Sequence, residues 1–465
     1  MLFVSPVFLF LFLPGVLALY YLLRRHRALQ NVWLFLASIF FYAWGEPRFS
    51  LMLLLSIALN WLFAMGIERW RTRQTVRRCL LTLAVAFDIG LLFVYKYLDF
   101  SISTLNVLLG AHIRLRNIAL PIGISFFSFQ ALSYVIDVYR GKEKQGVCAQ
   151  KNPLNVGLYI AFFPQLIAGP IVRYHSIEQQ IAQRRETAAD FGEGALRFMA
   201  GFSKKVLLAN SMAVIADRAF GADTPAVSFA WLGAVAYTLQ IFFDFSGYSD
   251  MAIGLGLMFG FHFDENFRLP YSSHTVTEFW RRWHISLSSW FRDYVYIPLG
   301  GNRCGRSRAV FNLFVVWLLT GIWHGANWTF IVWGLFYFCV LTLEKYTPLG
   351  ELLKRHRLIG GSYTMLAVTL AWVVFRAESL SAAGSYLAVM FGRGPLWSPV
   401  TWVCIRENMV FFAVAFAEAA GLPAKVFHRG KVLETAGTVL LSLCFFASII
   451  FVINGTYNPF IYFNF

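Results

Sequence analysis

The sequence is poor in charged residues. Only 14% of its 465 residues are charged and 58% are hydrophobic, whereas about a quarter of a typical soluble domain is charged. Apolar runs recur at 7–23, 49–67, 79–98, 228–243, 358–375, 402–421 and 433–453. A helix needs roughly 20 apolar residues to cross a bilayer, so the sequence predicts an all-α polytopic membrane protein with about eleven transmembrane helices.

The sequence also lacks the usual signatures of metal and hydrolase sites. No two of its six cysteines have C-x-x-C or metal-ligand spacing, at Cys79, Cys148, Cys304, Cys339, Cys404 and Cys444. Neither a disulfide framework nor a structural zinc is expected from such spacing. There is no G-x-S-x-G turn and no glycine-rich phosphate loop. No linker or repeat interrupts the chain, so we expect one integral-membrane domain over residues 1–465.

The net charge of +16 has two interpretations. Basic proteins can bind nucleic acid, but the cations here follow apolar runs, at 24–27, 69–78, 140–151, 306–308, 354–357 and 425–431. That distribution is typical of short cytoplasmic loops. It favours a lipid bilayer, and no nucleic acid, as the partner, with both termini on the outer side. In the N-terminal run the cations follow the apolar stretch, so we expect a retained first helix.

Helix-breaking residues interrupt two of the apolar regions. Pro121 and Gly123 open one of them, and Pro164, Gly169 and Pro170 break the other. Broken helices at membrane depth are tolerated only where the freed backbone is buried in protein or lines a cavity. Re-entrant or interfacial helices around an internal tunnel are therefore expected.

Polar side chains interrupt the segment YTLQIFFDFSGYSDMAIGLGL. Gln240, Asp244 and Tyr248 are four residues apart and share one face of a helix. An intramembrane carboxylate costs at least about 2.5 kcal/mol, so it usually faces a partner or water. Asp244 is accordingly either half of a structural ion pair or a group that lines a tunnel.

Residues 281–303, RRWHISLSSWFRDYVYIPLGGNR, combine arginines with aromatic residues. If 278–296 is one helix, then Arg281, His284, Ser288 and Arg292 lie on one face and aromatic residues on another. An interfacial anchor explains the arginines and aromatics. It leaves His284 unexplained, and this histidine has a structural and a chemical interpretation of equal weight.

His324 lies in FNLFVVWLLTGIWHGANWTFIVWGLFYF, an otherwise almost wholly apolar segment. At about 1.5 Å per residue, a helix from Val310 reaches His324 after roughly 21 Å, deep in the bilayer. The residue is either a hydrogen-bonded link between helices or a general base that works near neutral pH. A base, a hydroxyl acceptor and a thioester are sufficient for acyl transfer.

The motifs RRWHISLSSWFRDYVYIPLGGNR and GIWHGANWTF resemble the membrane-bound O-acyltransferase superfamily, in its bacterial alginate O-acetyltransferase branch. FFPQLIAGPIVRY, LQIFFDFSGYSDMAIGLGLMFGFHFDENFRLPY and YNPFIYFNF extend the resemblance over most of the chain. It implies that His324 and His284 are the catalytic histidines. It further implies a tunnel, with Asp244, Gln240, Arg281, Ser288, Arg292 and Asn327 as candidates for lining it or binding the donor.

The resemblance also implies the substrates and partners. The donor would be acetyl-CoA or another acetyl thioester, with no bound cofactor and no metal, and periplasmic acceptor proteins would complete the transfer. Tyr462 in the C-terminal tail is either an acyl relay or part of an interfacial aromatic belt. The location would be the bacterial inner membrane. Alginate is the first expectation for the polymer, with cellulose and peptidoglycan as alternatives.

Two functions from other classes stay open at this point. A flippase without chemistry would also use broken helices and midplane acids, although the sequence shows no inverted repeat. A non-catalytic scaffold of a polysaccharide export complex would tolerate replacement of His324. In both alternatives the histidines have no catalytic role, whereas an O-acetyltransferase needs them for the reaction.

Overall fold

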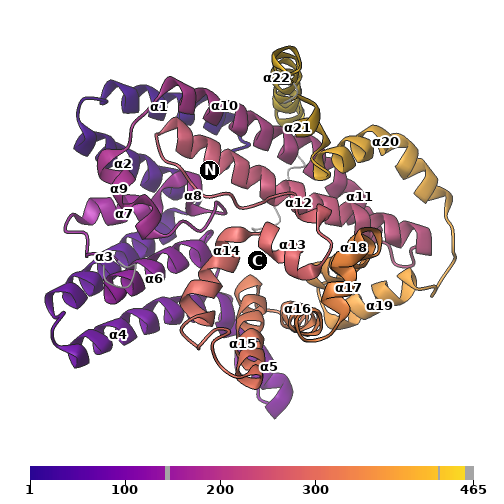
Figure 1. Ribbon diagram of the computed structural model, residues 1–465, viewed down its shortest axis with the longest axis horizontal. Coiled ribbons are helices and arrows are strands. Elements are labelled where there is room, and N and C mark those ends of the chain that lie inside the picture. The colour runs from indigo at the N-terminus through magenta and orange to yellow at the C-terminus, as the bar shows by residue number, and fades with distance from the viewer. Residues whose placement is uncertain (142–146, 428–429, 456–465) are drawn as a thin grey trace. The chain divides into compact units, whose positions relative to one another are not determined.

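The computed structural model describes residues 1–141, 147–427 and 430–455, and every regular element in them is a helix (Figure 1). This confirms the all-α prediction. Contacts divide the chain into two compact units, one of Met1–Phe198 with Met251–Asp264 and one of Met199–Asp250 with Glu265–Phe465.

The first unit contains the N-terminal helices. These are η1 (Phe8–Phe12, a π-helix), α1 (Leu13–Leu22), α2 (Arg27–Gly45), α3 (Pro47–Arg69), α4 (Gln74–Leu92), η2 (Phe93–Tyr97), α5 (Leu98–Leu109), α6 (Ile124–Arg140), α7 (Pro153–Ala161), α8 (Phe163–Leu166), α9 (Tyr174–Gln183) and most of α10 (Ala188–Ser203). Residues 251–258 at the end of α12 (Val227–Met258) also belong to it.

The second unit contains the rest of α12 and the C-terminal helices. These are η4 (Lys204–Ala209), α11 (Asn210–Phe220), η5 (Pro270–Ser272), α13 (Val276–Arg282), α14 (Ile285–Phe291), η6 (Arg292–Tyr296), α15 (Arg306–His324), α16 (Trp328–Tyr346), α17 (Leu349–Arg355), α18 (Arg357–Arg376), α19 (Leu380–Met390), α20 (Pro399–Ala419), α21 (Leu422–Phe427) and α22 (Lys431–Asn454).

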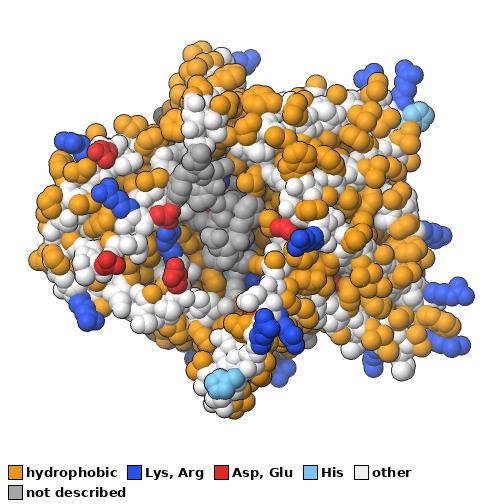
Figure 2. Space-filling view, turned by 180° about the vertical axis from the view of Figure 1, so that it is seen from behind, with side chains coloured by type: hydrophobic (Ala, Val, Ile, Leu, Met, Phe, Trp, Pro, Cys, Tyr) orange, Lys and Arg blue, Asp and Glu red, His pale blue; other side chains and the backbone are white. Residues whose placement is uncertain are grey.

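Nine helices in the described residues are long and apolar enough to cross a membrane. Two shorter apolar helices, Phe8–Leu22 and Leu380–Met390, accompany them. Hydrophobic side chains cover most of the face shown in Figure 2, and α22 exposes Phe446 and Ile450. Such a surface would be unfavourable in water and suits lipid. The protein is therefore a multi-pass membrane protein.

Local sequence explains where several helices begin. Asn152 caps α7 by accepting a hydrogen bond from the amide of Leu154, and Pro153 occupies the first helical position, where its missing N–H costs nothing. Thr275 caps α13 by accepting from the amide of Glu278. In the region of Pro164 the chain forms two short helices, α7 and α8, and Phe163–Leu166 are all buried. The expected interruption of the helix is confirmed.

Aromatic residues, including several tryptophans, make up much of the core of the second unit. Trp280, Trp283, Trp317, Trp333 and Trp372 are all buried in one cluster, and their rings meet mainly edge to face or tilted. Large rigid rings bury much apolar area with few rotatable bonds. This cluster surrounds the candidate site.

Candidate active site

The α15–α16 hairpin positions His324. A Cβ on Gly334 would lie 2.4 Å from the carbonyl oxygen of Trp317, and one on Gly321 would lie 2.5 Å from that of Phe330. Only glycine permits this approach of two backbones. His324 is the last residue of α15, so the expected helix from Val310 to His324 is confirmed and the packing of these two helices fixes the place of the imidazole.

Replacing Gly334 with alanine should destabilise the protein by about 1–3 kcal/mol, because overpacking against backbone cannot be relieved by a side-chain rotation. The same change should lower activity by displacing His324. Thermal unfolding in detergent and the rate of the catalysed reaction would measure the two effects. Gly384→Ala is the matched control, since a Cβ there meets nothing within 4 Å. Equal stability of the two variants would contradict the prediction.

Aromatic rings enclose His324. Its side chain is 5% exposed. The ring centroids of Trp323, Trp333 and Phe375 lie 5.0, 5.0 and 5.1 Å from its own, each at a steep angle. A general base in such a place works without competition from bulk water.

His284 lies at a break in the chain. The structure corrects the prediction of one helix over 278–296, because α13 ends at Arg282 and α14 begins at Ile285. His284 itself has a φ of 45°, a left-handed conformation that costs a non-glycine residue free energy and recurs at functional sites. Its side chain therefore leaves the face that carries Arg281, Ser288 and Arg292.

The fully buried His284 ring is held in one tautomer. Its Nδ1 lies 3.2 Å from Oδ1 of Asn266, which also accepts from the amide of Ser286. Since that oxygen is an acceptor, Nδ1 carries the proton and Nε2 does not. Nε2 has no hydrogen-bond partner among the described residues. Burial lowers the pKa of His284 to about 3, so the ring is neutral at physiological pH.

The ring of Trp323 packs against both histidines. Its ring centroid lies 5.0 Å from that of His324 and 6.0 Å from that of His284. Phe245 closes the other side of His284 at 4.6 Å. The structure thus gathers both predicted histidines around one indole, within one unit.

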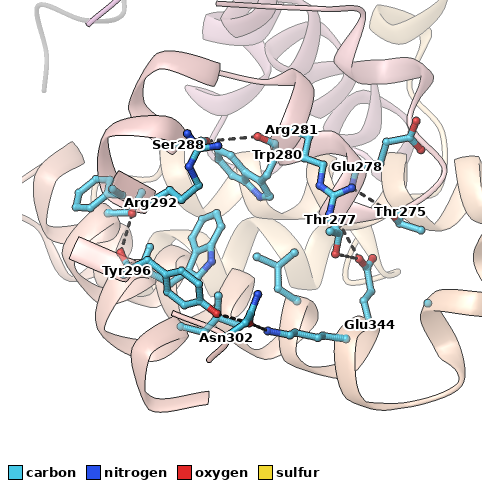
Figure 3. Close-up of a pocket in the computed structure, with 18 of the residues that line it drawn as sticks. Thr275, Thr277, Glu278, Trp280, Arg281, Ser288, Arg292, Tyr296, Asn302 and Glu344 are labelled. Carbon is cyan, nitrogen blue, oxygen red and sulfur yellow. Dashed lines mark hydrogen bonds between the residues drawn. The ribbon is translucent and has the colours of Figure 1, made fainter. Parts of the chain in front are cut away.

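A pocket of about 770 Å³ opens beside α13 and α14. Arg281, Ser288 and Arg292 line it, as helical periodicity predicted, whereas His284 does not (Figure 3). Trp280 and Trp317 supply apolar wall. The predicted cationic face is therefore present, without the histidine.

Charges around the pocket are largely engaged in pairs. Glu344 accepts hydrogen bonds from the amides of Val276 and Thr277, at 2.7 and 2.8 Å. It holds the N-terminus of α13, where a carboxylate is favourable. Arg292 pairs with Asp293 at 2.7 Å. Arg281 has no ion pair among the described residues, so its guanidinium is available to an anionic ligand.

The remaining candidates lie elsewhere. Asp244 forms a 2.8 Å ion pair with Lys205, with both side chains 2% exposed, as the structural interpretation expected. Gln240 accepts from Arg376 at 3.5 Å. Asn327 caps α16 and donates to the carbonyl of Glu378, so its amide is engaged in structure. Tyr462 lies outside the described residues.

Sequence reasoning missed two of these groups. Glu344 is a buried carboxylate in the last turn of the apolar helix α16, and such residues usually have a function or a partner. Lys205 follows Lys204 in a segment that contains no recognisable motif. A search for every charge within an apolar helix would have found both.

The sequence is similar to those of known proteins. The model of the membrane-bound O-acyltransferase family matches residues 149–349, which include both histidines. The chain is 41% identical to a probable alginate O-acetylase of Pseudomonas putida, over 100% of both chains. It is 36% identical to a peptidoglycan O-acetyltransferase of Helicobacter pylori, over 84% of this chain and 80% of the relative. The chain is 31% identical to a teichoic acid D-alanyltransferase of Bacillus subtilis, over 50% of this chain and 60% of the relative.

These matches define the class of protein. The chain belongs to the membrane-bound O-acyltransferase family. It is an acyltransferase, as the resemblance of its histidine motifs implied.

Proposed function

We propose that the protein transfers an acetyl group from a cytoplasmic thioester across the inner membrane for O-acetylation of an exported polysaccharide, with alginate as the polymer. The observation that carries this proposal is the identity of 41% with a probable alginate O-acetylase along the whole of both chains. Peptidoglycan is the second candidate, because the Helicobacter pylori relative is named for it.

His324 is the general base of the proposed reaction. It takes the proton of the acceptor hydroxyl while that oxygen attacks the thioester carbonyl, and the thiolate that leaves recovers the proton. His284 has a different part. An imidazole whose pKa is lowered to about 3 is a weak base, but its Nε2 can accept a hydrogen bond from the hydroxyl and orient it.

The pocket beside α13 binds the donor in this account. Its volume of about 770 Å³ lies within the range of small-molecule sites, and the guanidinium of Arg281 suits the phosphates of acetyl-CoA or of a carrier-bound thioester. Ser288 adds a hydroxyl near the carbonyl of Trp280. The apolar wall of Trp280 and Trp317 suits the neutral arm that follows the phosphates.

Reversing the charge of Arg281 tests the donor pocket. Arg281→Glu should raise the KM for acetyl-CoA about ten- to hundredfold, since a hydrogen bond to a charged group contributes about 1.5–3 kcal/mol. Membrane vesicles supplied with increasing acetyl-CoA would provide the measurement. Arg308→Glu, exposed and outside the pocket lining, is the control. A KM equal to that of wild type would refute the assignment of the pocket.

Periplasmic proteins complete the transfer to sugar hydroxyls in this proposal, and both chain termini face the periplasm. Tyr462 is the proposed acyl relay, because a phenol near a base can act as a transient nucleophile. Tyr462→Phe should then stop delivery of the acetyl group to the periplasm. A variant that keeps the full wild-type rate of acetyl transfer would exclude the relay.

The polymer is tested by chemical analysis of cells that lack the protein. Alkali-labile acetate should disappear from secreted alginate, while the amount of alginate and the acetate on peptidoglycan stay unchanged. Restoring the gene should restore the ester. If acetate is lost from peptidoglycan alone, the polymer is peptidoglycan, and the proposal for alginate fails.

A further inference from the structure

Three buried hydrogen-bond donors near His324 have no acceptor. They are the indole N–H groups of Trp280 and Trp333 and the hydroxyl of Tyr337, here called the donor cluster, and none has a hydrogen-bond partner among the described residues. Trp333 and Tyr337 are fully buried and Trp280 is 7% exposed. Leaving such groups unpaired is unfavourable, so three of them in one place indicate a site for an acceptor.

The members of the donor cluster lie side by side. The ring centroid of Trp280 is 5.6 Å from that of Trp333 and 4.9 Å from that of Tyr337, and the last two are 5.1 Å apart. Trp333 and Tyr337 are four residues apart on α16 and so share one face. Trp280 belongs to α13, and Glu344 of α16 accepts a hydrogen bond from the N-terminus of that helix. The same two helices therefore fix all three donors.

The donor cluster connects the pocket with the general base. Trp280 lines the pocket, and the ring of Trp333 packs at 5.0 Å against that of His324. Trp317 and Phe375 cover the cluster with apolar surface. A group that travels from the pocket to His324 would pass these donors.

The chemistry of the donor cluster restricts its ligand. Indole N–H groups only donate, so the ligand must accept. A carboxylate or phosphate would have to be buried among tryptophan rings without a counter-charge, which is strongly unfavourable. A neutral carbonyl oxygen fits, and it gains negative charge only in the transition state, where fixed donors help most.

We propose that the donor cluster binds the carbonyl oxygen of the acyl thioester and stabilises the oxyanion that forms there, an inference that rests on the proposed function. As His324 removes the hydroxyl proton, the acceptor oxygen forms a bond to the carbonyl carbon. The carbonyl π electrons move to the oxygen, which Trp333 and Tyr337 hold. When the double bond re-forms, the carbon–sulfur bond breaks and the thiolate takes the proton from His324.

Tyr337→Phe separates this role from packing. It removes one oxygen atom from a site where that atom has no partner, so the melting temperature should stay equal or rise. The rate of labelled acetate incorporation into secreted polysaccharide, per amount of membrane protein, should nevertheless fall about 10²–10³-fold. Trp333→Phe should lower the rate similarly, and the double variant should show less than the product of the two losses.

Tyr386→Phe is the matched control, because that buried tyrosine donates to the carbonyl of Ala230 at 3.0 Å. It should lower the melting temperature and leave the rate per folded protein unchanged. If Tyr337→Phe keeps the wild-type rate while His324→Ala loses it, the cluster holds a structural water or nothing, and this inference is wrong. If His324→Ala also keeps the rate, His324 is not the general base and the whole mechanism is wrong. If the wild-type protein itself incorporates no label, the proposed function is wrong.

Discussion

Replacing His324 with alanine should lower the rate of acetyl transfer about 10²–10⁴-fold, which is the typical contribution of a general base. The imidazole is buried against Trp323, Trp333 and Phe375. His284, whose ring packs against Trp323, is a weak base because burial lowers its pKa to about 3. Membranes that contain equal amounts of the two proteins would give the rates from labelled acetyl-CoA.

His356→Ala is the control for His324→Ala, because His356 is an exposed histidine of the same unit, between α17 and α18. It should keep the wild-type rate. A folded His324→Ala protein that transfers acetyl groups as fast as wild type would show that His324 is structural, and the mechanism would be wrong at its centre.

Breaking the Lys205–Asp244 pair should destabilise the protein by about 3–5 kcal/mol, the usual cost of leaving one buried charge without its partner. The pair joins two spanning segments, Ala188–Phe220 and Val227–Met258, and Lys205 also donates to Asn210 at 2.9 Å. Both Lys205→Met and Asp244→Asn should therefore lower the melting temperature in detergent and the protein level in membranes.

The double variant Lys205→Met/Asp244→Leu should recover most of that stability, because it removes both charges together. It should recover acetyl transfer as well if the pair is purely structural. Stable but inactive single variants would instead assign Asp244 to a tunnel, the interpretation that the sequence left open.

Helical periodicity predicted much of the site. It predicted a helix from Val310 to His324, which the structure confirms, and it grouped Arg281, Ser288 and Arg292, which line one pocket. Arg281 lies before the break between α13 and α14, and Ser288 and Arg292 lie after it. All three nevertheless line the same pocket.

The break itself was not predictable from local sequence. No glycine or proline occurs at 283–284, and the bend is held by Asn266, which accepts from the amides of Ile285 and Ser286. Such contacts between residues distant in sequence override local helix propensity. The partner of Asp244 was hidden for the same reason. The cost of an intramembrane carboxylate predicts that a partner exists, but only the fold assigns that partner to Lys205.

The donor cluster could not be predicted from the sequence either. Trp333 and Tyr337 share a face of α16, a pattern that in an apolar helix ordinarily indicates core packing. What points to a ligand is that their polar atoms are buried without an acceptor and lie beside Trp280, which lines the pocket.

The most direct test of the account compares secreted polysaccharide from cells with wild-type protein and from cells with His324→Ala, at matched membrane levels. Alkali-labile acetate and total polymer are measured together. The account predicts that the variant loses the acetate while the polymer is still secreted. Persistence of the acetate would contradict catalysis at His324, and loss of the polymer itself would favour a role in export over acetyl transfer.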